Sequence, residues 1–145
     1  MKMKIINRRA KYDYNLLEKF EAGIALTGPE VKSIRSGRLD LAQSFVRLID
    51  GEVWLINAHI HPYPFTDNRD YDSRRRRKLL LHKKEILKIQ QRIKEKGLTL
   101  VPVSCYTKGD KIKLEIALAK GKKKYEKREA IKKRDLEREI KSLGV

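Results

Sequence analysis

The sequence predicts a mainly β fold: a small antiparallel barrel with two to three short helices and a basic C-terminal tail. Apolar and polar residues alternate over 111–119, which is typical of a half-buried strand. Turn sequences at 108–110 (Lys-Gly-Asp) and 50–51 (Asp-Gly) join β-rich segments into hairpins. After Ala119 the alternation ends and a lysine-rich run begins. Together these observations favour an antiparallel sheet with an appended tail.

The first half of the chain supplies the other strands. Segment 20–26 alternates like a strand, and Gly23 within it indicates a bulge or a close approach of the backbone. Segment 14–19 fits a strand or a helix equally well. The hairpin over 44–60 has a nearly all-apolar return strand, so we expect both of its faces to be covered and Trp54 to lie in the core.

Two helices interrupt this β-rich pattern. Thr27-Gly28-Pro29-Glu30 offers an N-cap, a proline in the first turn and an acid near the positive helix end, for a helix that stops before Gly37. A longer helix is predicted from about residue 83 to 96, ended by Gly97 and followed by a strand over 99–106. The prolines and charges of 62–77 indicate a loop before it.

Five or six short strands with a couple of helices favour the OB fold, which presents an open, curved face to oligonucleotides. A two-layer α+β sandwich is the alternative. We expect an OB-fold body over residues 1–119 and a tail over 120–145. The tail has few apolar residues, so we expect it to be disordered, or helical once it contacts a partner.

The charge is large and unevenly distributed. The 145 residues include 36 Lys and Arg against 19 Asp and Glu, for a net charge of +17. Residues 71–97 carry a net +8 and residues 120–145 a net +6, whereas 1–70 carry only +2. This segregation predicts two contact surfaces for a polyanion, with nucleic acid favoured over a membrane surface.

Other classes of protein lack support in the sequence. No carboxylate pair, nucleophile–base pair or glycine-rich phosphate loop stands out, so we expect no enzyme and no cofactor. His59 and His61 form an H-x-H pair, but a zinc site usually has four ligands, so two ordinary histidines are favoured over a metal site. Cys105 is the single cysteine, and neither a signal peptide nor an apolar run of ~20 residues occurs. We expect a cytoplasmic protein.

The run Arg74–Lys78 is the strongest local signal for nucleic acid. Consecutive cations repel one another, and the apolar residues 79–81 that follow anchor the run to the body. A basic stretch fixed on a fold is typical of a surface that contacts phosphates. Among the aromatic residues, Tyr12, Tyr14 and Tyr125 lie beside basic clusters and are candidates for stacking on unpaired bases.

Several strings are more specific than these patterns. Asn7-Arg8-Arg9-Ala10, Tyr14 and Phe20–Leu26 are followed by Thr27-Gly28-x-Glu30-Val31-Lys32-Ser33-Ile34-Arg35-x-Gly37. Further blocks occur in order at Arg77–His82 and Ala119–Lys123. Over essentially its whole length the chain resembles the SmpB (SsrA-binding protein) family.

The resemblance implies a function in ribosome rescue. Members of the family have an OB-fold body that binds the tRNA-like domain of transfer-messenger RNA, which they accompany into the decoding site of a stalled ribosome. Their basic tail probes the empty mRNA channel and folds there as a helix, and trans-translation follows. The implied partners are this RNA and the ribosome, with elongation factor Tu and alanyl-tRNA synthetase acting indirectly on the same RNA. No membrane or DNA partner is implied.

The resemblance and the basic pattern together give a set of site residues. We predict RNA contacts at Asn7, Arg8, Tyr14, Glu21, Lys32, Arg35, Arg76, Arg77, Lys78, Leu80, His82, Lys113, Lys120 and Lys122. We predict ribosome contacts in the tail at Lys123, Lys124, Tyr125, Glu126, Lys127, Arg128, Lys132, Lys133, Arg134 and Leu136. A carboxylate such as Glu21 can accept hydrogen bonds from guanine or ribose hydroxyls. An internal ion pair between Glu21 and a nearby arginine is an equal alternative.

Overall fold

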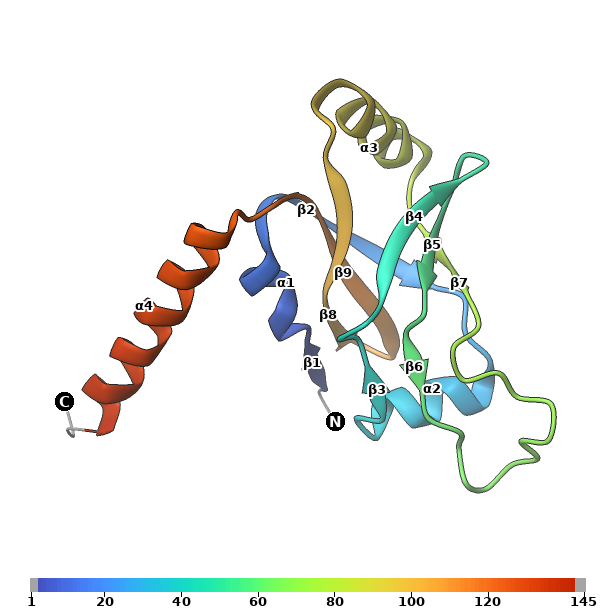
Figure 1. Cartoon of the computed structure of the whole chain (residues 1–145). Coiled ribbons are helices and arrows are strands. Elements are labelled where there is room, and N and C mark those ends of the chain that lie inside the picture. The colour runs from blue at the N-terminus through green and yellow to red at the C-terminus, as the bar shows by residue number, and fades with distance from the viewer. Residues whose placement is uncertain (1–2, 143–145) are drawn as a thin grey trace.

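A computed structural model describes residues 3–142, without the side chains of residues 124–126, 130, 131 and 139–142. The elements in chain order are β1 (Lys4–Ile6), α1 (Arg8–Asp13), β2 (Tyr14–Ile24), α2 (Gly28–Arg35), β3 (Leu39–Asp40), β4 (Phe45–Ile49), β5 (Glu52–Ile56), β6 (His59–Ile60), β7 (Arg77–Leu80), α3 (Lys83–Lys96), β8 (Thr99–Lys108), β9 (Lys111–Gly121) and α4 (Lys124–Ser142). Figure 1 shows the strands gathered into one body, from which α4 projects. The predicted mainly β, antiparallel class is confirmed.

The large sheet closes on itself. Strands β4, β5, β7, β2 and β9 follow one another as antiparallel neighbours, and β8 pairs with both β9 and β4. Six of the described strands therefore form a barrel-like ring, as predicted in preference to the sandwich. Strand β1 pairs with another part of β8, and β3 with β6 forms a separate two-stranded sheet.

The core follows from the alternation along β9 and its neighbours. Ile112, Leu114 and Ile116 point inward and are buried, while Lys113 and Glu115 between them face outward. Strand β2 pairs with β9 along almost its whole length, which makes the ambiguous segment 14–19 a strand rather than a helix. The register shift in this pairing lies between Leu16 and Glu18, so the bulge is not at Gly23.

Both predicted helices form where their caps predict. In α2 the Thr27 Oγ1 accepts a hydrogen bond from the Glu30 N–H at 3.3 Å, and the Glu30 carboxylate accepts one from the Thr27 N–H at 3.0 Å. This reciprocal pair satisfies two backbone donors that a helix start leaves open. Helix α3 ends at Gly97, whose φ of +62° suits glycine, and packs on the core through the fully buried Ile89.

Two features differ from the sequence predictions. Strand β5 buries Val53 and Leu55 but leaves Trp54 between them half-buried, so only one of its faces is covered and Trp54 is not core. Helix α1 was not expected, because its six residues are too few to show an amphipathic period. It forms because the buried Ala10 packs beside β8 and β9 in a small second cluster with Val101.

The end of the barrel lies slightly beyond residue 119. Strand β9 continues to Gly121, and the Lys122 N–H donates to the carbonyl of Asp13 at 2.9 Å. The helix α4 begins at Lys124. The division into a body and a tail stays a prediction. Within residues 3–142, no helix is both long and apolar enough to span a membrane.

Candidate nucleic-acid interface

A groove runs over the outside of the barrel where β7, β2 and β9 lie side by side. The strand register places Leu80, Gly23 and Lys113 in one row across these three strands. Gly23 has no side chain, so the row is hollow at its centre. A Cβ atom there would lie 3.3 Å from the Cβ of Leu80, which confirms the predicted close approach. The groove encloses about 630 Å³.

Four predicted RNA contacts from separate parts of the sequence line this groove. They are Glu21, Leu80, His82 and Lys113. Leu80 is 54% exposed, so its side chain offers an apolar surface to the groove. An apolar surface flanked by a lysine suits a base or sugar that lies next to a phosphate.

The carboxylate of Glu21 has internal partners at the edge of the groove. It accepts a hydrogen bond from the hydroxyl of Tyr106, and its Oε1 lies 3.1 Å from the Nζ of Lys108. The Tyr106 hydrogen bond and the Lys108 ammonium lower the pKa of Glu21, so the carboxylate is ionised at neutral pH. The internal ion pair foreseen as the alternative role is therefore present, with a lysine in place of the expected arginine. Glu21 is still exposed to solvent.

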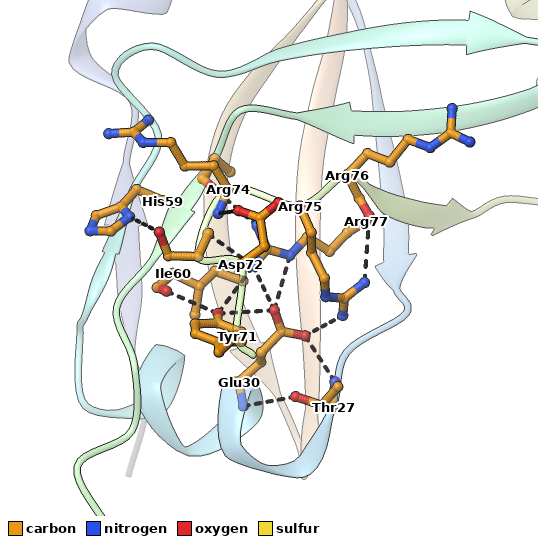
Figure 2. Close-up of polar contacts among 12 residues, drawn as sticks. Thr27, Glu30, His59, Ile60, Tyr71, Asp72, Arg74, Arg75, Arg76 and Arg77 are labelled. Atoms are coloured by element: carbon orange, nitrogen blue, oxygen red, sulfur yellow. Dashed lines mark hydrogen bonds and ion pairs between the residues drawn. The ribbon is translucent and has the colours of Figure 1, made fainter. Parts of the chain in front are cut away.

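The arginine run divides into inward and outward members. Glu30 is 1% exposed, and its Oε2 lies 2.5 Å from the Nη2 of Arg77, which is fully buried. Arg75 pairs with the other oxygen of the same carboxylate. The Tyr71 hydroxyl oxygen lies 3.1 Å from the Oε2 of Glu30 and 2.9 Å from the carbonyl oxygen of Ile60, and its single proton serves one of these two acceptors at a time. Figure 2 shows this network at the start of α2.

Burial and pairing set the ionisation of the network. Burial raises the pKa of Glu30, but hydrogen bonds from the Thr27 N–H, Arg75 and Arg77 outweigh it and lower the pKa to about 2. Burial is also the main cause that raises the pKa of Tyr71 to about 12. The carboxylate is thus charged, and the tyrosine neutral, throughout the physiological range.

One predicted contact in the run needs correction. Arg77 also donates to the carbonyls of Ala58 at 2.8 Å and Ser73 at 3.0 Å, so its guanidinium is engaged inside the protein and does not reach a polyanion. Arg76 faces solvent with its Cζ 4.7 Å from the centre of the Trp54 ring. Lys78 also faces outward, and its Nζ lies 3.2 Å from a carboxylate oxygen of Glu52.

A second correction concerns Asn7, which is 7% exposed. Its Nδ2 donates to the carbonyl of Pro102 at 2.8 Å, and its backbone N–H donates to Val103. The side chain therefore holds β1 and α1 against β8 and does not lie on the surface. The sequence could not show this, because an asparagine before a short helix also fits an exposed cap.

The other predicted RNA contacts lie on the surface outside the groove. Arg8, Lys32, Arg35 and Lys120 are exposed, and Tyr14 and Lys122 are half-buried. The Nη2 of Arg35 donates to the carbonyl of Asp110 at 2.6 Å, which brings α2 to the β8–β9 turn beside the groove. The Nζ of Lys122 donates to the carbonyl of Lys11 at 2.7 Å. All of these residues stay predictions as RNA contacts.

The tail helix α4 meets the body at α1. The Nζ of Lys127 lies 3.3 Å from the Oδ1 of Asp13 and 5.8 Å from the centre of the Tyr12 ring. Arg134 and Arg138 line a hollow of about 360 Å³ together with Arg8, Lys11 and other residues of the N-terminal segment. The predicted tail residues with an exposed side chain are Lys123, Arg128, Lys132, Lys133, Arg134 and Leu136. The side chains of Lys124, Tyr125 and Glu126 lie outside the described residues.

The histidine pair has a local structural role. The rings of His59 and His61 have centroids 4.2 Å apart, and the Nδ1 of His59 lies 2.9 Å from the Oγ of Ser73. Burial, followed by the neighbouring His61, lowers the pKa of His59. Across the part of the chain that the structure describes, no three His, Cys, Asp or Glu residues cluster as metal ligands.

The barrel and the open groove on its outer face define a class: small β-barrel proteins that offer a curved sheet face to an oligonucleotide. The SmpB protein family matches residues 4–143. The chain belongs to the SmpB family. The motif strings of the sequence predict the same family.

Individual relatives agree with this assignment. A protein of Sulfurihydrogenibium sp. named SsrA-binding protein is 59% identical over 134 residues, which are 92% of this chain and 88% of the relative. One of the same name from Persephonella marina is 53% identical over 140 residues, 97% and 92% of the two chains. A solved structure described as "tmRNA-SmpB: a journey to the center of the bacterial ribosome" superposes with a TM-score of 0.68 at 48% identity, covering 83% of this chain and 85% of the other.

Proposed function

We propose that this protein is an RNA-binding adaptor that binds transfer-messenger RNA and brings it to stalled ribosomes for trans-translation. Membership of the SmpB family and the likeness to a tmRNA–SmpB structure support this function. The observation in the molecule itself that carries it is the groove, where Glu21, Leu80 and Lys113 meet around Gly23. The protein acts as an adaptor rather than an enzyme, in the bacterial cytoplasm where ribosomes are found.

Within this function, the barrel binds the tRNA-like domain of the RNA. The groove supports this assignment because it combines an apolar wall, a lysine and hydrogen-bonding groups on a rigid sheet. The exposed carboxylate of Glu21 is suited to accept hydrogen bonds from guanine or ribose hydroxyls. Elongation factor Tu and alanyl-tRNA synthetase act on the same RNA without a contact on this chain.

The tail helix enters the empty mRNA channel of the ribosome. Its exposed cations, which include Arg128, Lys132 and Lys133, suit a channel lined with phosphates. Helix α4 touches the body at α1 through Lys127 and Asp13, so it is free to change its contacts without unfolding the barrel. This division of labour gives the barrel and the tail each an RNA surface.

The binding experiment is a gel shift of the full chain with the tRNA-like domain in the presence of excess bulk tRNA. A shift that survives the competitor supports the proposed function. Loss of the shift would favour a protein that binds ribosomal RNA directly. Specific cleavage of labelled RNA in the presence of a divalent metal would instead identify a nuclease.

The tail is tested by truncation after Lys123. This end point keeps strand β9 to Gly121 and the Lys122 hydrogen bonds to the carbonyls of Asp13 and Lys11. We expect the truncated protein to bind the RNA with nearly unchanged affinity and to lose tagging on stalled ribosomes. Full tagging activity without the tail would refute the division of labour.

A further inference from the structure

Two arginine–aromatic pairs lie together on the outer face of β4, β5 and β7. Arg76 has its Cζ 4.7 Å from the centre of the Trp54 ring, and Arg47 has its Cζ 5.0 Å from the centre of the Phe45 ring. The strand register places Arg47, Trp54 and Lys78 directly opposite one another in one row. We call Phe45, Arg47, Trp54, Arg76 and Lys78 the stacked strip.

The inward half of the arginine run fixes the outward half. Arg75 and Arg77 are held by the Glu30 carboxylate, and this alternation turns Arg76 to the opposite side of the chain. Figure 2 shows Arg76 pointing away from Glu30. A buried ion network beneath the segment therefore orients an exposed guanidinium, which reduces the entropy lost when that group binds a ligand.

The chemistry of the strip suits phosphate groups. A guanidinium stacked on an aromatic ring keeps its N–H edge free, and that edge matches two phosphate oxygens at once. Among the residues that the structure describes, neither Arg47 nor Arg76 is paired with a carboxylate. Lys78 is paired with Glu52, so the strip has a net positive charge. The strip is therefore better suited to an anionic partner than to an apolar partner with few hydrogen-bond acceptors.

The strip is continuous with the groove. Lys78 belongs to the strip and Leu80 to the groove, and they face outward two residues apart on β7. From Lys113 on β9 to Arg47 on β4 the surface crosses four strand spacings, about 19 Å. OB folds accommodate ~4–16 nucleotides, so one RNA molecule is able to cover both parts.

We infer that the stacked strip is a second phosphate-binding surface for the same RNA that occupies the groove, the tRNA-like domain of transfer-messenger RNA. This inference rests on the proposed function. It assigns contacts to Phe45, Arg47 and Trp54, which no motif or charge cluster of the sequence indicated. The strip adds binding energy and fixes the direction in which the RNA leaves the groove.

The main test is a double substitution, Arg47→Gln with Arg76→Gln, in the full chain. Both side chains are exposed, so the fold should be kept, and circular dichroism checks this. Affinity for the tRNA-like domain is measured at several salt concentrations. We expect about a tenfold weaker affinity. We also expect a log K against log salt slope that is smaller by roughly 1.4–1.8, since each lost phosphate contact contributes about 0.7–0.9.

The control is Arg69→Gln, which removes one exposed arginine where the double variant removes two. Arg69 is paired with Asp67 in the loop before β7. We expect its affinity and slope to equal those of the unaltered protein. If the double variant behaves like this control, the strip does not contact RNA. If the unaltered protein itself fails to prefer the tRNA-like domain over bulk tRNA, the proposed function fails instead.

A second measurement uses the single tryptophan of the chain. Trp54 is half-buried, so acrylamide quenches part of its fluorescence in the free protein. We expect this quenching to fall as the RNA saturates, over the same concentrations as the gel shift. Unchanged quenching would overturn the inference. The last measurement is ribosome binding by the double variant. Weaker ribosome binding with unchanged binding of the tRNA-like domain would also overturn the inference, because that result would assign the strip to ribosomal RNA.

Discussion

The substitution Glu30→Gln tests the buried ion network that carries the arginine run. It keeps the shape of the side chain and removes the charge that faces Arg75 and Arg77. Arg77 is fully buried, so the variant leaves a buried guanidinium without its carboxylate partner. Breaking one side of such a pair typically destabilises a protein by about 3–5 kcal/mol.

The pKa of Glu30 gives a similar magnitude by another route. A fall from an ordinary 4.5 to about 2 corresponds to roughly 3 kcal/mol of stability when the carboxylate is ionised. For a chain of this length, a loss of about 3 kcal/mol lowers the melting temperature by ~10 °C. Urea unfolding at pH 7 measures the free energy directly.

The pH dependence provides the sharper check. The pKa of Glu30 is lowered in the folded state, so its contribution to stability is complete above about pH 4.5 and is lost as the pH falls towards 2. We expect the stability difference between the unaltered protein and Glu30→Gln to shrink over this interval. Effects that do not involve Glu30 are common to both proteins and cancel in the difference.

The control for this experiment is Glu52→Gln, which removes the carboxylate that pairs with Lys78 at 3.2 Å. Both of these side chains are nearly half exposed, so its loss should change stability by only ~0–1 kcal/mol. If Glu30→Gln were no more destabilising than this control, or if its difference from the unaltered protein did not depend on pH, the network would not stabilise the fold as argued.

Three further predictions follow from other parts of the molecule. Gly23→Val fills the floor of the groove, where a Cβ meets Leu80 at 3.3 Å, and should weaken binding of the tRNA-like domain about tenfold in a gel shift. Cys105 is fully buried, which raises the pKa of its thiol to about 12, so a thiol reagent at pH 8 should modify it only after the protein is unfolded in guanidinium. Lys127→Gln removes the contact with Asp13 that holds α4 on α1, and should speed cleavage by trypsin between the body and the tail. Its effect on unfolding should be small, ~0–1 kcal/mol.

A different result would contradict each of these three predictions. Gly28→Ala is the control for the groove, because a Cβ at that glycine meets nothing within 4 Å, and equal RNA affinity of the two glycine variants would contradict the groove assignment. Rapid modification of the native thiol would contradict the burial of Cys105. If Lys127→Gln were cleaved as slowly as Lys132→Gln, the contact with α1 would not hold the tail.

The sequence predicted the elements whose signals are local. The alternation over 111–119, the Thr27–Glu30 cap and the Gly97 stop each determine their element through neighbouring residues, and all three form as expected. Segment 14–19 could not be assigned in this way, because its strand character comes from pairing with β9, about a hundred residues away. Long-range pairing is invisible to a short sequence window.

The same distinction explains the site. The charge cluster of the arginine run is evident in the sequence. However, Arg77 is buried against Glu30, which lies 47 residues earlier, whereas Arg76 is exposed to solvent. Strand alternation through β7 was the signal that could have separated them. The almost wholly apolar sequence of its strand predicts a core position for Trp54, whereas the β5 face to which Trp54 belongs is open to Arg76.

Strand β9 connects the groove to the start of the tail without a hinge. It runs unbroken from Lys113 in the groove to Gly121, just before the tail, and eight residues of strand span ~27 Å. A paired strand within a closed ring does not stretch or swivel as a linker does. When an RNA is bound at the groove, the first residue of the tail therefore lies at a fixed distance from that RNA. Under the proposed function, α4 therefore starts from a fixed position relative to the bound RNA, which raises its effective concentration at any target within reach.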